Sequence, residues 1–201
     1  YDVQSGSLIK EISNNYAVGK PKKDEYLDNE KGVCSFSDNS RYVAVQADAT
    51  GVFDLEEYTT SGSLYTETKA IRLTTDGSKL YYLKGKSYNE GIKWCEFDVL
   101  NPKPPTEEAL NLSLDEVLIS DDAYQKVNAA ISPDLNLIAY VRNEEIWVYN
   151  RNEFVNTAFL KVHQSYVRQV RWLANGILVS AVNANTIRFW AAVNGVEIAT
   201  V

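Results

Sequence analysis

Residues 162–191 read V-H-Q-S-Y-V-R-Q-V-R-W-L-A-N-G-I-L-V-S-A-V-N-A-N-T-I-R-F-W-A. Apolar and β-branched residues gather in three short runs of this stretch, and Asn175-Gly176 separates the first run from the second. Runs of this kind, bounded by turn residues, are typical of short antiparallel strands. The stretch therefore predicts three strands of one small sheet, followed by an outer strand at residues 196–201.

The same succession of strands and turns occurs three more times upstream. Its first turns are Ser37-Asp38-Asn39-Ser40, Thr74-Thr75-Asp76-Gly77 and Ser132-Pro133-Asp134, and a later turn is expected at Thr60-Ser61-Gly62. Units that recur about every 35–45 residues are typical of propeller blades or solenoids. The sequence predicts an all-β fold, a β-propeller of four-stranded antiparallel blades, with blades at residues 32–67, 68–114, 127–161 and 162–201.

Residues 1–12 contain the end of one strand and a second strand, which we expect to be the end of a preceding blade. The last unit already has its own outer strand, so this leading segment belongs elsewhere in the ring. A half-ring would leave strand edges and blade faces unpaired. We therefore expect the chain to be a portion of a larger propeller of about six to eight blades.

Composition and charge narrow the class of protein. The chain has 13 Tyr, 6 Phe and 4 Trp, and such residues favour pleated, half-buried strands. Its net charge of −7 argues against a nucleic-acid or anionic-lipid surface. No apolar run approaches the roughly 18–20 residues that span a bilayer, and no N-terminal segment resembles a signal peptide. We expect an intracellular protein, cytoplasmic or nuclear, with no membrane partner.

The two cysteines, Cys34 and Cys95, lie inside separate predicted strands. We interpret them as buried thiols, with a disulfide as the alternative. The chain has neither a C-x-x-C motif nor a Cys/His cluster, and it has no glycine-rich phosphate loop. We therefore expect no metal and no cofactor.

The last unit resembles a repeat of the WD-repeat propeller family. His163, Ser180 and Trp190 match the family's histidine, second-strand serine and third-strand tryptophan. In the family these side chains join a turn aspartate in a buried hydrogen-bond relay, so the resemblance implies a structural relay of His163, Ser180 and Trp190. The aspartate position aligns with Ala184, and Ala191 follows the tryptophan where the family has aspartate. The repeats are therefore divergent.

Catalytic interpretations find little support. His163 is the only histidine, and a Ser-His-Asp hydrolase would also need a serine in an elbow such as G-x-S-x-G, which does not occur. Acidic pairs such as Glu107-Glu108 lie in or beside predicted turns, where exposed loop charge explains them better than acid–base chemistry. We expect a protein that is not an enzyme.

The family resemblance implies a protein-interaction scaffold within a multiprotein complex. Such a disc binds peptides or neighbouring subunits on its top face and rim, and the remaining blades of the same propeller would also contact this chain. Loop residues beside the inner strands are the expected partner-binding residues, because tyrosine and arginine are frequent binding hot spots. These are Tyr124, Asn143, Tyr166, Arg168 and Asn183.

Two alternatives stay open. The runs T-T-D-G-S-K-L at residues 74–80 and I-S-P-D at 131–134 also resemble repeats of serine-peptidase propellers and of periplasmic-type propellers. The other alternative is a nucleic-acid-associated propeller subunit that uses a basic loop of Lys20, Lys22 and Lys23. Acidic residues follow this loop directly, which favours an ordinary solvated loop.

Overall fold

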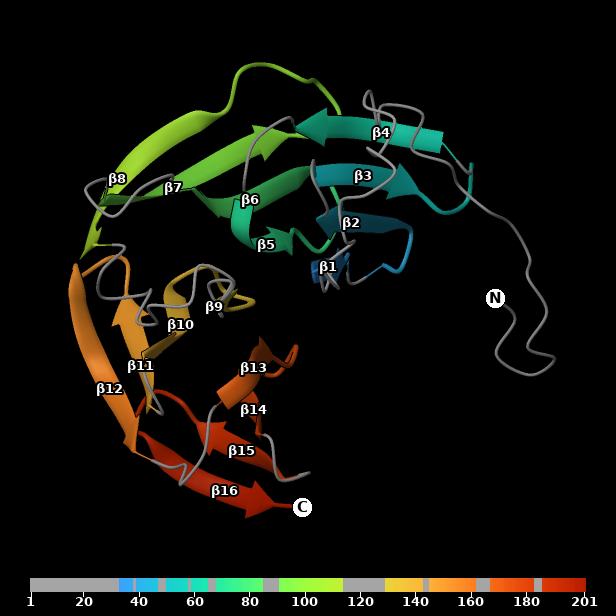
Figure 1. The fold of residues 1–201 in the computed structure, drawn as a ribbon. Helices are drawn as coiled ribbons and strands as arrows, with labels where there is room; N and C mark the ends of the chain where they lie inside the picture. The colour runs from blue at the N-terminus through green and yellow to red at the C-terminus, as the bar shows by residue number, and fades with distance from the viewer. Residues whose placement is uncertain are drawn as a thin grey trace, which may run out of the picture.

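The structure is a computed structural model that describes residues 33–37, 39–46, 50–57, 59–64, 68–84, 91–113, 129–142, 145–161, 167–182 and 186–201. In this part of the chain all regular structure is β-strand, arranged as four antiparallel sheets of four strands each. Figure 1 shows the sheets as blades along an open arc, with one strand of each at the centre. The prediction of an all-β propeller with four-stranded antiparallel blades is confirmed.

Strand order within every blade follows the chain, from the centre to the rim. Blade 1 contains β1 (Val33–Phe36), β2 (Tyr42–Gln46), β3 (Thr50–Asp54) and β4 (Thr59–Leu64). Blade 2 contains β5 (Thr68–Leu73), β6 (Lys79–Lys84), β7 (Gly91–Asp98) and β8 (Thr106–Ser113). Blade 3 contains β9 (Ala129–Ile131), β10 (Leu137–Arg142), β11 (Glu145–Asn150) and β12 (Val155–Lys161). Blade 4 contains β13 (Val167–Trp172), β14 (Leu178–Val182), β15 (Ile187–Ala191) and β16 (Val196–Thr200).

Two outer strands differ from the sequence-based expectation. The turn expected at residues 60–62 is wrong, because these residues lie within β4. Gly62 permits this by its lack of a side chain: a Cβ atom there would lie 3.0 Å from Phe97 Cε1 in blade 2. The strand β8 begins at Thr106, so Glu107 and Glu108 are strand residues rather than turn residues.

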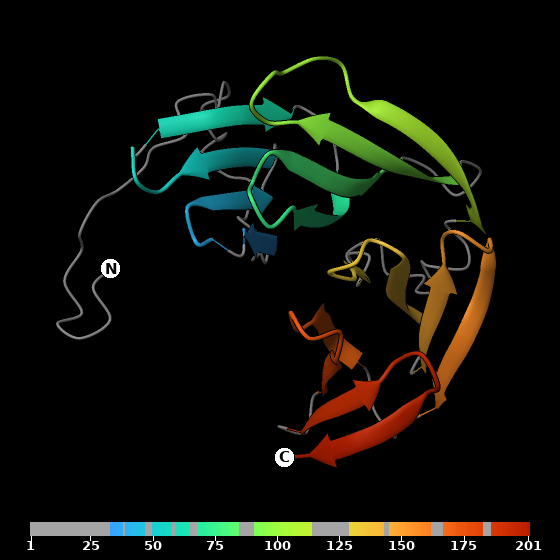
Figure 2. The ribbon, with the colours of Figure 1, turned by 180° about the vertical axis from the view of Figure 1, so that it is seen from behind.

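The turn between the first two strands is built in the same way in blades 1 to 3. A hydroxyl accepts a hydrogen bond from the backbone N–H five residues later and donates to an Asx side chain two residues later, as expected for turns rich in these residues. The hydroxyls belong to Ser37, Thr74 and Ser132, and their distances to the backbone nitrogens are 2.9, 3.0 and 2.8 Å. These turns can be followed around the centre in Figure 2.

A second repeated turn follows the third strand of each blade. Asp54, Asp98 and Asn150 each end this strand, and one side-chain oxygen of each accepts hydrogen bonds from the backbone N–H groups two and three residues later. In blade 4 the position holds Ala191, and its backbone carbonyl accepts from the N–H groups of Asn194 and Gly195 instead. The missing carboxylate in the last repeat is therefore replaced by the main chain.

The core consists of three apolar clusters, each shared by two neighbouring blades. We call the face that a blade turns to the next blade along the chain its forward face, and the opposite face its rear face. Val52 of blade 1 and Ile146 of blade 3 lie on forward faces, whereas Leu80 and Cys95 of blade 2 lie on a rear face. The fold is thus held together by face-to-face packing of successive blades.

The two cysteines are free. Cys95 is buried between blades 1 and 2, as expected. The expectation of a buried thiol is wrong for Cys34, which is exposed because it lies on the rear face of blade 1, where no described blade packs. Within the described residues no helix is long and apolar enough to cross a membrane.

Candidate protein-interaction site

The third strand and the second strand of blade 4 are joined by a buried side-chain hydrogen bond. Trp190 Nε1 donates to Ser180 Oγ at 3.0 Å, and the two residues are only 3% and 0% exposed. A polar pair at this depth is favourable only while its donor and acceptor meet. His163 lies outside the described residues, so the relay of three side chains stays a prediction.

Ser180→Ala is expected to destabilise the protein by about 1–3 kcal/mol, because it removes an acceptor of the buried Trp190 N–H. The free energy of unfolding from urea titrations checks this value. Trp190→Phe and the double variant complete a mutant cycle, in which the two losses should not add because they remove the same bond. Additive losses would mean that the bond contributes nothing measurable.

Four of the five predicted partner-binding residues, Tyr124, Asn143, Tyr166 and Asn183, lie outside the described residues. Arg168 lies in β13 and is exposed. The register of β13 and β14 shifts between Val167 and Gln169, so Arg168 stands at a β-bulge. Bulges re-aim side chains next to functional sites. Its role in binding stays a prediction.

The inner strands of all four blades meet around a small central cavity of about 150 Å³. Its lining consists of Cys34, Ser35, Phe36, Ile71, Arg72, Ala129, Ala130, Ile131, Arg171 and Trp172. Sites for small-molecule ligands usually enclose about 300–1,000 Å³. The cavity is therefore below the size of such sites and suits a single inserted side chain.

Two of the lining positions serve to join neighbouring blades. Each inner strand has an equivalent last-but-one residue, which is Ser35 in blade 1 and Ala130 in blade 3. Ser35 Oγ accepts a hydrogen bond from the Leu73 N–H at 3.0 Å. The Ala130 carbonyl accepts one from Trp172 Nε1 at 3.1 Å. These contacts fix blade 1 to blade 2 and blade 3 to blade 4.

The equivalent residues of blades 2 and 4 are arginines, Arg72 and Arg171, and both are partly buried. Arg171 Nη1 donates to the Val170 carbonyl at 2.7 Å. Burial lowers the pKa of the Arg171 guanidinium, because a low-dielectric site disfavours the charged form. Among the described lining residues two are arginines and none is acidic. Arg171 lies three positions after Arg168, which the sequence predicts to bind a partner. The sequence does not indicate, however, that the strand of both residues borders a cavity, and only the fold shows this.

A second hollow of about 220 Å³ lies between blades 2 and 3. The Arg151 guanidinium carbon lies 4.7 Å from the Trp94 ring centroid, and Arg151 Nη1 pairs with Glu108 at 3.1 Å. Lys84 and Lys93 pair with Glu107 and hold the pKa of its carboxyl at about 2. Arg151 therefore links blade 3 to blade 2 through Trp94 and Glu108, whereas Glu107 is paired within blade 2.

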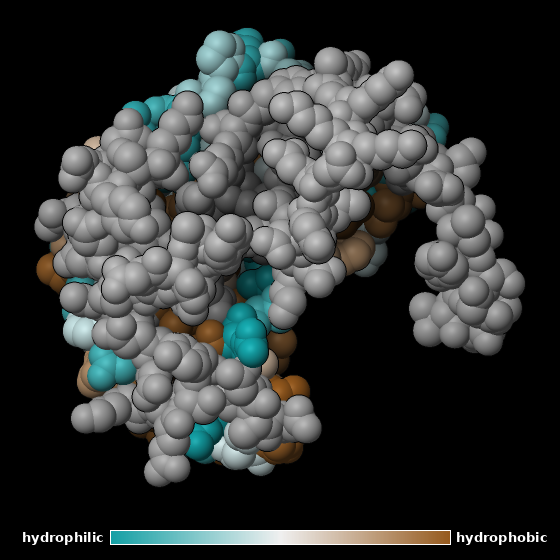
Figure 3. Space-filling view, viewed as in Figure 1, coloured by the Kyte–Doolittle hydropathy of each residue, from teal (hydrophilic) through white to brown (hydrophobic). Residues whose placement is uncertain are grey.

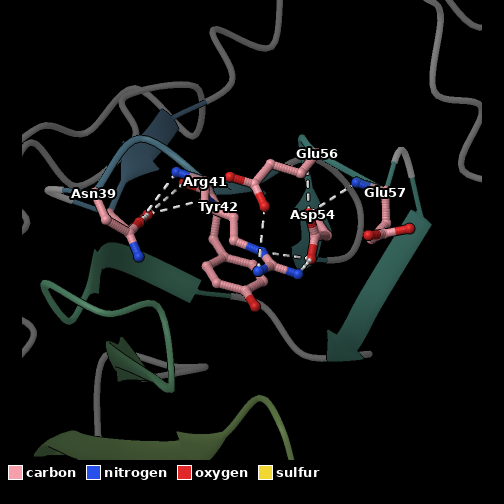
Figure 4. A network of polar contacts seen from close by, with 7 residues as sticks. Asn39, Arg41, Tyr42, Asp54, Glu56 and Glu57 are labelled. Carbon is pink, nitrogen blue, oxygen red and sulfur yellow. Dashed lines mark hydrogen bonds and ion pairs between the residues drawn. The ribbon is translucent and has the colours of Figure 1, made fainter.

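A polar network fixes the turns of blade 1 where β2 begins and β3 ends (Figure 4). Arg41 donates to Asp54 Oδ2 through Nε at 2.9 Å and Nη2 at 2.7 Å. Asp54 Oδ1 accepts from the N–H groups of Glu56 and Glu57. These bonds, chiefly that from Arg41, lower the pKa of the Asp54 carboxyl.

Asp54→Ala is expected to cost about 2–3 kcal/mol of stability. The value lies below the 3–5 kcal/mol typical of a broken buried pair, because Arg41 keeps 36% of its side chain exposed and stays hydrated. Asp54→Asn should cost less, since its side-chain oxygen still accepts the hydrogen bonds of the turn.

The stabilisation by the Asp54 carboxylate depends on pH. Because the folded-state pKa of Asp54 is lowered, the stabilisation is complete above the unfolded-state pKa near 3.9 and is lost as the pH falls below it. Urea titrations between pH 2 and 6 measure the free energy of unfolding at each pH. If this free energy falls at acid pH by the same amount in Asp54→Asn as in the wild type, the prediction is contradicted.

The forward face of blade 4 carries apolar side chains with no described blade against them. Ile187 and Phe189 occupy the positions that Ile146 and Val148 hold in blade 3, since both pairs precede the end of the third strand by the same number of residues. Ile146 and Val148 are 0% exposed, whereas Ile187 is 40% exposed. The sequence thus keeps apolar residues at positions that are internal in the preceding blade.

The rear face of blade 1 is the other end of the arc. Phe36 is 56% exposed there, whereas Leu73 at the equivalent place in blade 2 is 2% exposed. Figure 3 shows hydrophobic surface along the borders of blades 1 and 4 that face the gap. Both ends of the arc therefore present faces of the kind that blades bury against one another elsewhere in the molecule.

Among the described residues, no three side chains that could bind a metal come together. The architecture is that of a β-propeller with four described blades. No protein-family model matches the chain, and no curated protein matches it.

Proposed function

We propose that the chain is a non-catalytic protein-interaction scaffold, a WD-repeat-like propeller subunit of a multiprotein complex. The observation that carries this proposal is the composition of the central cavity, which combines Phe36, Arg72, Arg171 and Trp172 in a space of side-chain size. Aromatic and arginine side chains supply most binding energy at protein interfaces. A cavity of about 150 Å³ favours an anchoring side chain of a partner over a small-molecule substrate.

The remaining blades of the same propeller are the second partner that we propose. The open forward face of blade 4 supports this, because Ile187 is 40% exposed, whereas Ile146 at the equivalent position of blade 3 is 0% exposed. Burial of apolar area contributes about 25 cal/mol per Å². In a larger ring of about six to eight blades, a following blade would cover this forward face.

The experiment is quantitative affinity capture from a cell extract with three forms of the protein: wild type, Phe36→Ser and Val193→Ser. Phe36 lines the cavity, whereas Val193 is 78% exposed in the turn between β15 and β16 and serves as the matched control. We expect at least one protein whose recovery falls about tenfold, equivalent to about 1.4 kcal/mol, with Phe36→Ser only.

Thermal unfolding of each variant shows whether the fold is retained. Equal recovery of every captured protein by wild type and Phe36→Ser would contradict the proposed role of the cavity. Equal losses with both variants would also contradict it, since Val193 is not one of the residues that line the cavity.

A further inference from the structure

We propose that the central cavity binds an acidic segment of a partner protein, with an aspartate or glutamate side chain of that segment paired to Arg171. The inference rests on the proposed interaction function and names the partner chemistry of the same cavity.

The first support is the pairing of arginines in the described part of the chain. Arg41 pairs with Asp54, Arg151 with Glu108 and Arg188 with Glu197. Arg171 differs, because no described carboxylate lies within ion-pair distance of its guanidinium and its hydrogen bond goes to the carbonyl of the preceding residue. Among the described residues, no other acceptor takes the remaining N–H groups of the Arg171 guanidinium.

The second support is the energetic state of this cation. A partly buried charge without a counter-ion loses hydration and gains no Coulomb energy in return. The depressed pKa of Arg171 has this origin. A carboxylate offsets the loss, and the planar guanidinium can hold its two oxygens through two parallel N–H bonds. The chemistry of the site therefore matches a carboxylate better than a neutral group.

The third support is the charge around the opening. Arg72 also lines the cavity, and none of the described lining residues is acidic. The whole chain carries a net charge of −7, which would repel an acidic partner at long range. At physiological ionic strength the Debye length is about 8 Å, so charges on the distant rim act weakly at the centre. The nearby Arg171 therefore influences what the cavity binds more than the distant charges do.

The size and the apolar wall of the cavity define the rest of the ligand. A space of about 150 Å³ admits one side chain rather than a folded loop. Phe36, 56% exposed, and the ring of Trp172 border the same space. The acidic side chain would occupy this space, and a neighbouring apolar residue of the segment would contact the exposed part of Phe36 at its border. We therefore expect a segment in which glutamate or aspartate alternates with leucine or a similar side chain.

The test is a nuclear magnetic resonance titration that follows the arginine side-chain Nε–H signals of the whole chain. The probe is a peptide of alternating glutamate and leucine, and the control peptide has glutamine in place of glutamate. We expect the Arg171 signal to shift with the acidic peptide at millimolar concentration, while the Arg188 signal stays in place. The glutamine peptide should bind at least about tenfold more weakly.

Two variants make the titration specific. Arg171→Gln should reduce the affinity for the acidic peptide about tenfold, whereas Arg188→Gln, in an ion pair on the outer half of blade 4, should leave it unchanged. An unperturbed Arg171 signal at saturating peptide would overturn the proposal. So would acidic-peptide binding that Arg171→Gln does not weaken, and so would inorganic phosphate or acetate that binds Arg171 as tightly as the peptide does.

Affinity capture separates this inference from the function on which it rests. If the partner lost by Phe36→Ser is still recovered with Arg171→Gln, the scaffold function stands and the acidic segment is excluded. If neither variant changes the captured proteins, both proposals fail.

Discussion

Ile146→Asp is expected to lower the free energy of unfolding by about 5 kcal/mol, a large part of the 5–15 kcal/mol that stabilises a typical domain. Ile146 is 0% exposed and belongs to the apolar cluster between blades 3 and 4. The variant loses the burial of an isoleucine and places a carboxylate in an apolar site without a counter-ion. We expect a protein that unfolds at or near room temperature.

Ile187→Asp makes the same chemical change at the equivalent position of blade 4. Ile187 is 40% exposed, so its new carboxylate stays hydrated, and the expected loss is about 1 kcal/mol or less. Urea titrations of the two variants at pH 7 measure the difference. Losses of equal size would show that the forward face of blade 4 is buried in solution as it is in blade 3, which contradicts the open arc.

Gly77→Ala is expected to destabilise the protein by about 2–6 kcal/mol, from two additive causes. The backbone φ of Gly77 is +75°, where a residue with a Cβ atom is strained by about 1–3 kcal/mol. A Cβ atom there would also lie 2.1 Å from Tyr42 Cδ2, and relieving such an overlap in a packed site costs a further 1–3 kcal/mol or so. Tyr42 belongs to blade 1, so the substitution also loosens the contact between blades 1 and 2.

Gly176→Ala is the matched control. Gly176 has a similar φ of +80°, but no atom lies within 4 Å of a Cβ atom placed there. Its substitution therefore carries only the backbone strain, and we expect a loss of about 1–3 kcal/mol. Thermal and urea unfolding compare the two variants. If Gly77→Ala costs no more than Gly176→Ala, the packing of Tyr42 on the turn of blade 2 does not exist in solution.

The propeller architecture could be predicted because its turns and strands depend on local sequence patterns. Turns with a hydroxyl and an Asx side chain, such as Ser132-Pro133-Asp134, recur between apolar runs, and the structure places these turns between the first and second strands. The strand ends at Asp54 and Asp98 follow the same logic. Such features depend on residues close in sequence, so they can be recognised without knowledge of tertiary contacts.

The errors in outer strands have the opposite origin. Residues 60–62 read as a turn because serine and glycine favour turns, but Gly62 is a strand residue that lets blade 1 approach Phe97 of blade 2. The exposure of Cys34 likewise depends on whether a neighbouring blade covers it. These properties are set by contacts between blades, which local composition does not encode.

The candidate site was only partly accessible to sequence reasoning. Arginine and tyrosine in loops were the natural hypothesis for partner binding, and the positions lie mostly outside the described residues. The cavity instead uses strand residues, Arg72 and Arg171, that occupy equivalent places in blades 2 and 4. Aligning the last-but-one residues of the inner strands would have revealed this pair, but their convergence on one space requires the ring geometry.

Site-specific photo-crosslinking tests the central claim, the scaffold function of the cavity, most directly. A photoreactive phenylalanine analogue at Phe36 lies in the cavity lining, and the same analogue at Val193 lies in an exposed turn elsewhere. In cells, we predict that the analogue at Phe36 forms a discrete adduct with another protein and that the Arg171→Gln background weakens this adduct without changing the Val193 control. The same adducts from both positions, or none from Phe36, would contradict the account.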